Sequence, residues 1–342
     1  MVNDYKSPNM YVENKRLPYI DMCKGLLIIM VMIGHMQNVC KELGVQNDVF
    51  INIDHLEWFW GPFFMPAFFV ITGFCSNFNK PYRKFLISNI KGILIPSFTL
   101  GVIASWIGLL YASDLSIGSF FHWGIRRFLI SGGYWFLAAL FLSKLSYYWI
   151  NKISNRYAIS IILIIMHIIG YFLFTNSICY NIWYFQHAMM LTLYLYVGQS
   201  LKELQISIKD KTLLFSWVAF IALVGVVLLL GYESPHIAHN VTINNVLLIP
   251  HLIFSVWGAY MIIQTTKRLK ENRLLIYLGQ NSLIYYCIHI KFLYFYIIIY
   301  RDILNEFSFL YWFLTIVSVI LSCTIVSKLL NTKYLKIILG KF

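Results

Sequence analysis

Ten apolar stretches, each close to the length of a membrane-spanning helix, constrain this chain more than any other feature. A helix needs about 20 mostly apolar residues to cross the hydrocarbon core of a bilayer. The stretches cover approximately residues 19–39, 57–76, 92–112, 134–150, 158–175, 182–200, 212–231, 244–264, 281–300 and 308–328. Backbone polar groups in lipid must pair within their own segment, so these runs are expected to be helical. The sequence therefore predicts an all-α polytopic membrane protein with about ten transmembrane helices.

The composition agrees with a chain whose main partner is the lipid bilayer. Of the 342 residues, 59% are hydrophobic and 12% are charged, whereas an average soluble domain has about 25% charged residues. This balance excludes a disordered chain, a nucleic-acid-binding globule and a secreted disulfide scaffold. The six cysteines are scattered singly, without CxxC or CxxH spacing. They are predicted to be free thiols that serve as small apolar residues.

The distribution of basic residues predicts the orientation of the chain. Twenty of the 27 lysines and arginines fall on one side of the ten stretches, four fall on the other side, and three lie within or at the ends of stretches. Because basic loops favour the cytoplasm, both termini are predicted to be cytoplasmic. Most of the net charge of +13 is then explained by topology and by attraction to anionic lipid. The predicted boundaries are a tail at 1–18, a transmembrane domain at 19–330 and a tail at 331–342.

The first stretch carries the densest set of polar residues, namely Asp21, Lys24 and His35. Ionisable groups in lipid are costly, so each is a functional candidate. Asp21 and Lys24 are three residues apart and share one helix face. Lys24 and His35 are eleven residues apart, which places them on one stripe about 16 Å apart along the axis. The stripe predicts a polar cavity, although Asp21 and Lys24 also fit a role in pairing or anchoring near the inner end.

The second stretch contains features that break helices. Gly61, Pro62, Pro66 and Gly73 all fall within one apolar run. This pattern predicts a kinked or broken helix, which persists where backbone lines a cavity or packs against protein. On these residues alone, a kink that serves packing is favoured over a functional break.

Four short motifs follow one another along the chain. They are Tyr19, Asp21, Lys24, Gly25 and Gly34-His35; then Met65-Pro66, Phe68-Phe69 and Thr72-Gly73; then Trp135-Phe136-Leu137; then Gly279, Asn281-Ser282-Leu283, Tyr285 and His289. In this order the chain resembles the membrane-bound acyltransferase family 3 over essentially residues 17–330. Two positions depart from the family pattern. Phe64 stands where relatives often have a histidine, and only Lys91 matches the basic pair that often precedes the third stretch.

The resemblance implies transfer of an acyl group, usually acetyl, from a cytosolic donor such as acetyl-CoA to a hydroxyl of a glycan or lipid-linked sugar. It also implies a bacterial cytoplasmic membrane and no permanently bound cofactor. His35 is the expected catalytic residue, as general base or as a transient acyl carrier. Lys24 and Lys91 could meet the phosphates of the donor, and Asp21 could orient Lys24. The thioester is expected to reach His35 along the stripe.

Further candidates also have a structural explanation, which for Trp135 is the favoured one. His289 and Asn281 are expected to line the same cavity or to pack in the core. Trp135 could stack on a sugar or anchor the helix at the interface. His236 and His239 are predicted to be ordinary loop residues, and no metal site is predicted.

A transporter or flippase for a glycan or lipid-linked sugar is the main alternative function. Such a protein would also show intramembrane charges and broken helices. It predicts a repeat shared by the two halves of the chain, which the sequence does not display, and it does not require the stripe that ends at His35.

Overall fold

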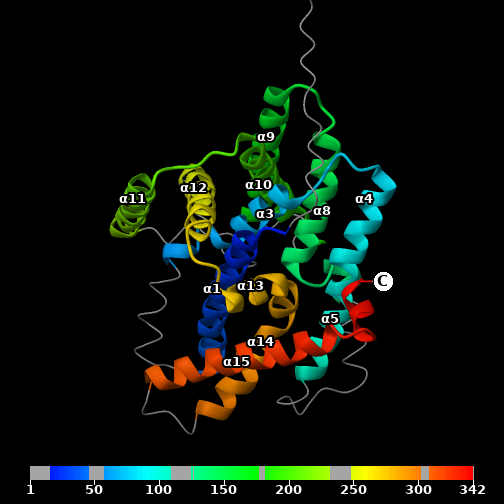
Figure 1. The fold of residues 1–342 in the computed structure, drawn as a ribbon, viewed down its shortest axis with the longest axis vertical. Coiled ribbons are helices and arrows are strands. Elements are labelled where there is room, and N and C mark those ends of the chain that lie inside the picture. Colours follow the sequence, from blue (N-terminus) through cyan, green and yellow to red (C-terminus); the bar gives the residue numbers. More distant parts are fainter. Residues whose placement is uncertain are drawn as a thin grey trace, which may run out of the picture.

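Helices form all the regular structure in the described part of the chain. The computed structural model describes residues 16–45, 58–108, 125, 127–176, 182–231, 248–301 and 308–341 (Figure 1). The elements are α1 (Pro18–Glu42), α3 (Phe64–Cys75), α4 (Tyr82–Asn89), the π-helical turn η1 (Ile90–Leu94), α5 (Ile95–Gly108), α7 (Arg127–Ser131), α8 (Trp135–Ile150), α9 (Arg156–Thr175), α10 (Phe185–Leu204), α11 (Asp210–Leu229), α12 (Leu248–Thr266), α13 (Arg273–Gln280), α14 (Ser282–Arg301), α15 (Ser308–Leu330) and the 3₁₀ turn η4 (Leu335–Leu339).

The prediction of an all-α polytopic membrane protein is confirmed. Among the described residues, eight helices are long and apolar enough to cross a membrane. The other two predicted spans are also helices. They are α8, which has 16 residues, and α10, whose 20 residues include the buried polar side chains Gln186, His187 and Thr192. The orientation of the chain and its division into tails and membrane domain stay predictions.

The predicted break in the second span is confirmed. The helical segment Trp58–Cys75 is interrupted by a turn at residues 61–63, and α3 begins at Phe64. Pro66 has no amide hydrogen to bond the carbonyl of Pro62, one helical turn before it. The hydroxyl of Ser255 on α12 donates to that carbonyl instead, at 2.6 Å. The break is therefore tied to a neighbouring helix.

Helices α3 and α10 pack backbone against backbone. Gly73 on α3 lies against the carbonyl of Leu195, and Gly198 on α10 lies against the carbonyl of Val70. A Cβ at either glycine would overlap these atoms. Helix α10 also packs against α8 and α9, so it is the centre of one group of helices (Figure 1).

Helix α1 packs in the same manner against α13. The sequence predicts a loop at about 265–280, but residues Arg273–Gln280 form α13. Gly25 lies against the carbonyl of Leu275, and Gly279 lies against that of Asp21. Helix α1 contacts α14 as well, and this arrangement places the polar stripe of the first span beside α13 and α14.

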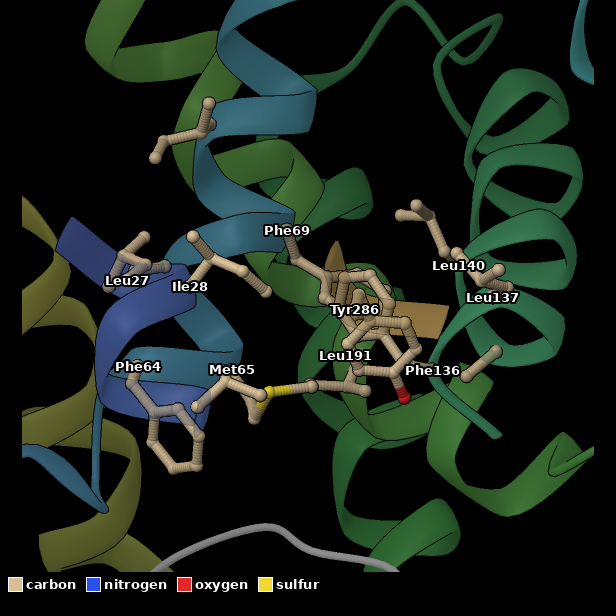
Figure 2. Packing of buried hydrophobic residues seen from close by; sticks show 14 of the residues in the cluster. Leu27, Ile28, Phe64, Met65, Phe69, Phe136, Leu137, Leu140, Leu191 and Tyr286 are labelled. Carbon is tan, nitrogen blue, oxygen red and sulfur yellow. The ribbon is translucent and has the colours of Figure 1, made fainter. Parts of the chain in front are cut away.

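A fully packed apolar core joins the two groups of helices. Figure 2 shows Ile28 of α1 close to α3, with Phe69, Phe136 and Tyr286 side by side. The ring centroids of Phe69 and Phe136 are 5.3 Å apart, and those of Phe136 and Tyr286 are 5.2 Å apart. These rings connect α3, α8 and α14 and hold α14 next to α1.

The segment after α15 folds back on the helices. The hydroxyl of Thr99 on α5 donates to the carbonyl of Ile338 at 2.6 Å. Gly340, with φ of +68°, lies against the carbonyl of Lys91. Three residues of the sequence analysis, Cys179, His236 and His239, lie outside the described residues.

Candidate active site

The structure brings two histidines from different helices into contact. His35 on α1 and His289 on α14 have ring centroids 5.2 Å apart, with an angle of 45° between the ring planes. His289 is fully buried, whereas His35 is partly exposed. The sequence predicts these residues in one cavity, and the structure places their rings side by side.

A hydrogen bond fixes the chemical state of the neutral His289 ring. Its Nδ1 lies 2.8 Å from the backbone carbonyl of Tyr285. A carbonyl only accepts hydrogen bonds, so Nδ1 carries the hydrogen and the lone pair is on Nε2. Nε2 is buried and has no hydrogen-bond partner in the part of the chain described here. His289 therefore holds an unused basic nitrogen beside His35.

The acidic residue of the stripe is held by charged and polar neighbours. The carboxylate of Asp21 is buried and accepts a hydrogen bond from Arg16 Nε at 2.7 Å. Gln280 donates to the same oxygen at 3.3 Å, and Lys24 Nζ lies 3.9 Å from the other oxygen. Asp21 and Lys24 thus form an ion pair, as one interpretation of the sequence expects, but Arg16 is the closer partner.

A cavity of about 780 Å³ opens beside Asp21 and Lys24. It lies between the ends of α1, α3, α10 and α12 and includes four basic residues, Arg16, Lys24, Lys202 and Lys267. In the sequence, Arg16, Lys202 and Lys267 belong to the basic residues that mark topology, a share of which could also serve an anionic cytosolic substrate. Loops far apart in sequence give no sign that these three residues converge. Their common assignment to the inner side is the one signal that could have grouped them.

The cavity does not continue along the stripe to His35. On α1 its lining ends at Lys24. Ile28 and Val31 lie between Lys24 and His35 on the same face of the helix, and their exposed fractions are 0% and 1%. The expectation of a continuous polar route along the stripe is therefore wrong for this arrangement, since two packed apolar side chains fill it.

Two other predicted site residues lie apart from the histidines. Lys91 is exposed in the turn η1 and does not line the cavity. Asn281 donates to the carbonyl of Tyr277 at 2.9 Å and accepts from Asn331 at 2.8 Å. Asn331 in turn accepts from Lys341, whose pKa is lowered by burial and by the nearby Arg16. Asn281 thus joins α13 and α14 to the end of α15.

Trp135 stands at the start of α8 and is partly exposed. Its ring lies against that of His187, with 5.3 Å between centroids. His187 is fully buried at the start of α10. The sequence analysis does not single out His187, because a lone histidine in an apolar run is not distinctive.

These features define a polytopic membrane protein with two histidines in contact, one of them fully buried, and a separate basic cavity beside the same helix α1. The model of the acyltransferase domain of acyltransferase family 3 matches residues 17–328. The chain belongs to this family and is an acyltransferase. Comparison with curated proteins gives no match, and comparison with solved structures gives none either. The family assignment favours acyl transfer over the transporter alternative.

Proposed function

We propose that the protein transfers an acetyl group from a cytosolic acyl-CoA to a hydroxyl of a cell-surface glycan or glycolipid precursor. The contact between His35 and His289 is the observation that carries this proposal. It supplies imidazole nitrogens inside the candidate spanning segments, and a basic cavity, which suits a polyanionic donor, lies at the N-terminal end of the same helix α1.

The chemistry needs a base because a hydroxyl is a weak nucleophile near neutral pH. His35 takes the hydroxyl proton while the hydroxyl oxygen bonds to the acyl carbon. The carbon–sulfur bond of the thioester then breaks, and the proton passes to the departing thiolate of CoA. In the covalent route, a ring nitrogen of His35 first bonds to the acyl carbon while the carbon–sulfur bond breaks and the thiolate of CoA departs. The hydroxyl oxygen then bonds to the acyl carbon while the carbon–nitrogen bond breaks, and the hydroxyl proton passes to the thiolate. Both routes use the imidazole of His35, which is partly exposed.

The packed side chains of Ile28 and Val31 close the path between the cavity and His35, and we call these two side chains the gate. A thioester that arrives from the cavity reaches His35 only after these side chains move. When they are in place, they keep the water of the cavity away from the imidazole. His35 then cannot activate that water to hydrolyse the thioester.

The direct test is the acetylation of surface glycans, measured by mass spectrometry in cells that express the wild type or His35→Ala at equal membrane levels. We expect His35→Ala to lose O-acetyl groups. His167→Gln is a matched control, because His167 is another buried histidine whose Nδ1 bonds a backbone carbonyl, that of Met190 at 2.9 Å. Unchanged acetylation in His35→Ala would refute the catalytic role, and unchanged acetylation after deletion of the protein would refute the function.

A further inference from the structure

The start of α4 and the end of α8, which lie side by side in Figure 1, are joined by a cluster of aromatic rings. The ring of Tyr148 on α8 stacks on that of Phe85, with 4.6 Å between centroids, and lies 5.4 Å from that of Tyr82. Its hydroxyl donates to the carbonyl of Lys80 at 2.9 Å. The ring of Tyr82 also contacts that of Trp149, at 5.0 Å. Residues 80–85 are therefore held against the last turn of α8.

Basic side chains surround this cluster. Lys80, Arg83 and Lys152 are exposed, and Nζ of Lys152 lies over the ring of Tyr148, 4.8 Å from its centroid. We call this group of side chains the interfacial patch, and it consists of Lys80, Tyr82, Arg83, Trp149 and Lys152. No residue of the patch is among the described residues that line the basic cavity, so the patch is a separate feature of the surface.

The positive charge of the interfacial patch has no acidic counterpart. Between residues 58 and 202 the single acidic residue is Asp114, which lies outside the described residues. Glu203, which follows this stretch, is paired with Arg156 at 2.8 Å. In the described chain no basic residue of the patch forms a salt bridge. Positive groups gathered in this way attract an anionic partner.

The aromatic residues of the patch indicate which kind of anion it fits. The exposed fractions of Tyr82 and Trp149 are 37% and 58%, and Trp149 lies in the last turn of a predicted span. Tyrosine and tryptophan at the ends of spans lie at the level of the lipid headgroups. A soluble anion would use only the charges. A phospholipid would use the charges for its phosphate and the two exposed rings for the upper part of its chains.

We propose that the interfacial patch is a binding site for the headgroup of one anionic phospholipid, with Lys80, Arg83 and Lys152 on its phosphate. Basic clusters beside spanning helices are typical sites for anionic headgroups. The site differs from a general attraction of basic loops to the membrane, because its residues come from two helices that the aromatic cluster holds together. A bound lipid would bridge α4 and α8. This inference does not depend on the acyl transfer reaction.

The test uses the fluorescence of Trp149 in nanodiscs of phosphatidylcholine that contain a small fraction of brominated lipid. Bromine on the upper part of the chains quenches a tryptophan that it contacts, and the difference between wild type and Trp149→Phe isolates the signal of Trp149. The measured quantity is the ratio of quenching by brominated phosphatidylglycerol to quenching by brominated phosphatidylcholine. We expect this ratio to be well above one for the wild type and to fall at high salt, because salt screens exposed charges.

Variants of the basic residues show whether the patch causes this preference. Arg83→Gln and Lys152→Gln should each lower the ratio by up to about fivefold, which corresponds to one basic residue near an anionic surface. Quenching by brominated phosphatidylcholine should stay unchanged in both variants, since Trp149 still faces lipid. Lys211→Gln is the matched control, because Lys211 is an exposed basic residue on α11 outside the patch, and it should keep the wild-type ratio.

Three results would overturn the assignment. The first is a ratio close to one for the wild type, which would mean that Trp149 contacts lipid without regard to charge. The second is a high ratio that neither glutamine variant lowers, because the preference would then arise elsewhere. The third is displacement of the brominated phosphatidylglycerol by soluble glycerol phosphate, since the site would then recognise a free phosphate and not a lipid.

Discussion

His35 and His289 lie ring against ring, and His289 is held in place by the hydrogen bond from its Nδ1 to the carbonyl of Tyr285. The bond leaves the basic Nε2 of His289 without a hydrogen-bond partner in the described chain. A proton on His35 therefore has a second imidazole close by, and the two rings together offer two nitrogen bases at one place.

The substitution His289→Asn tests this pairing. The asparagine side chain would retain an amide donor for the carbonyl of Tyr285 but lose the basic nitrogen. We expect the rate of acyl transfer to fall by about 10²–10⁴-fold, the usual contribution of a positioned acid or base, with KM for acyl-CoA unchanged. His167→Asn is the matched control, since His167 makes the same kind of backbone hydrogen bond on α9. A normal rate in His289→Asn would show that the second imidazole is dispensable.

The hydroxyl of Ser255 should stabilise the break in the second span. Ser255→Ala leaves the carbonyl of Pro62 without its donor, and we expect a loss of about 1–3 kcal/mol in the free energy of unfolding. In a Pro66→Ala background the new amide hydrogen at residue 66 can bond that carbonyl. The cost of Ser255→Ala should then become smaller, as measured by unfolding in detergent. Strictly additive effects of the two substitutions would contradict this explanation.

The contact between α1 and α13 should tolerate no side chain at Gly279. A Cβ there overlaps the carbonyl of Asp21, so Gly279→Ala is expected to cost about 1–3 kcal/mol by overpacking. Gly225 on α11 has open space around a built Cβ. Gly225→Ala should therefore be neutral or stabilising by up to about 1 kcal/mol, because alanine favours helix. Equal melting temperatures for the two variants would count against the close packing.

The gate between the cavity and His35 should limit the hydrolysis of acyl-CoA when no acceptor is present. Ile28→Ala removes a fully buried side chain from the stripe and should admit water to His35. We expect the hydrolysis of acyl-CoA in the absence of acceptor to rise several-fold, as measured by release of free CoA. Ile297→Ala is the matched control, because Ile297 is equally buried two turns beyond His289 on α14. The gate is disproved if both variants leave hydrolysis at the wild-type rate.

The sequence is sufficient to predict the spanning helices. It does not predict the short helix between two spans or the contacts that this helix makes. Apolar runs of about 20 residues require helices in lipid, and the prolines of the second span mark a break that the structure contains. Helix α13 is not predicted, because its eight residues are far fewer than the roughly 20 that mark a span. The packing glycines Gly25 and Gly279 are visible in the sequence, but their contacts join α1 to that missing helix.

In the candidate site, too, the sequence predicts the local helical geometry but not the contacts between helices. Helical geometry places Lys24 and His35 on one face, and that arithmetic holds for any regular helix. It does not reveal that Ile28 and Val31 fill the space between them, because burial depends on neighbouring helices. The convergence of Lys202 and Lys267 is likewise a property of tertiary packing, since two helices, α11 and α12, lie between these residues in the sequence.

The paired glycine contacts of α3 with α10, and of α1 with α13, have a consequence for motion. Gly73 and Gly198 each lie under a backbone carbonyl of the opposite helix, so one helix cannot slide along the other without driving side chains into the main chain. Each pair must move as one rigid body. Any rearrangement during the catalytic cycle is therefore expected at the seam between the two pairs.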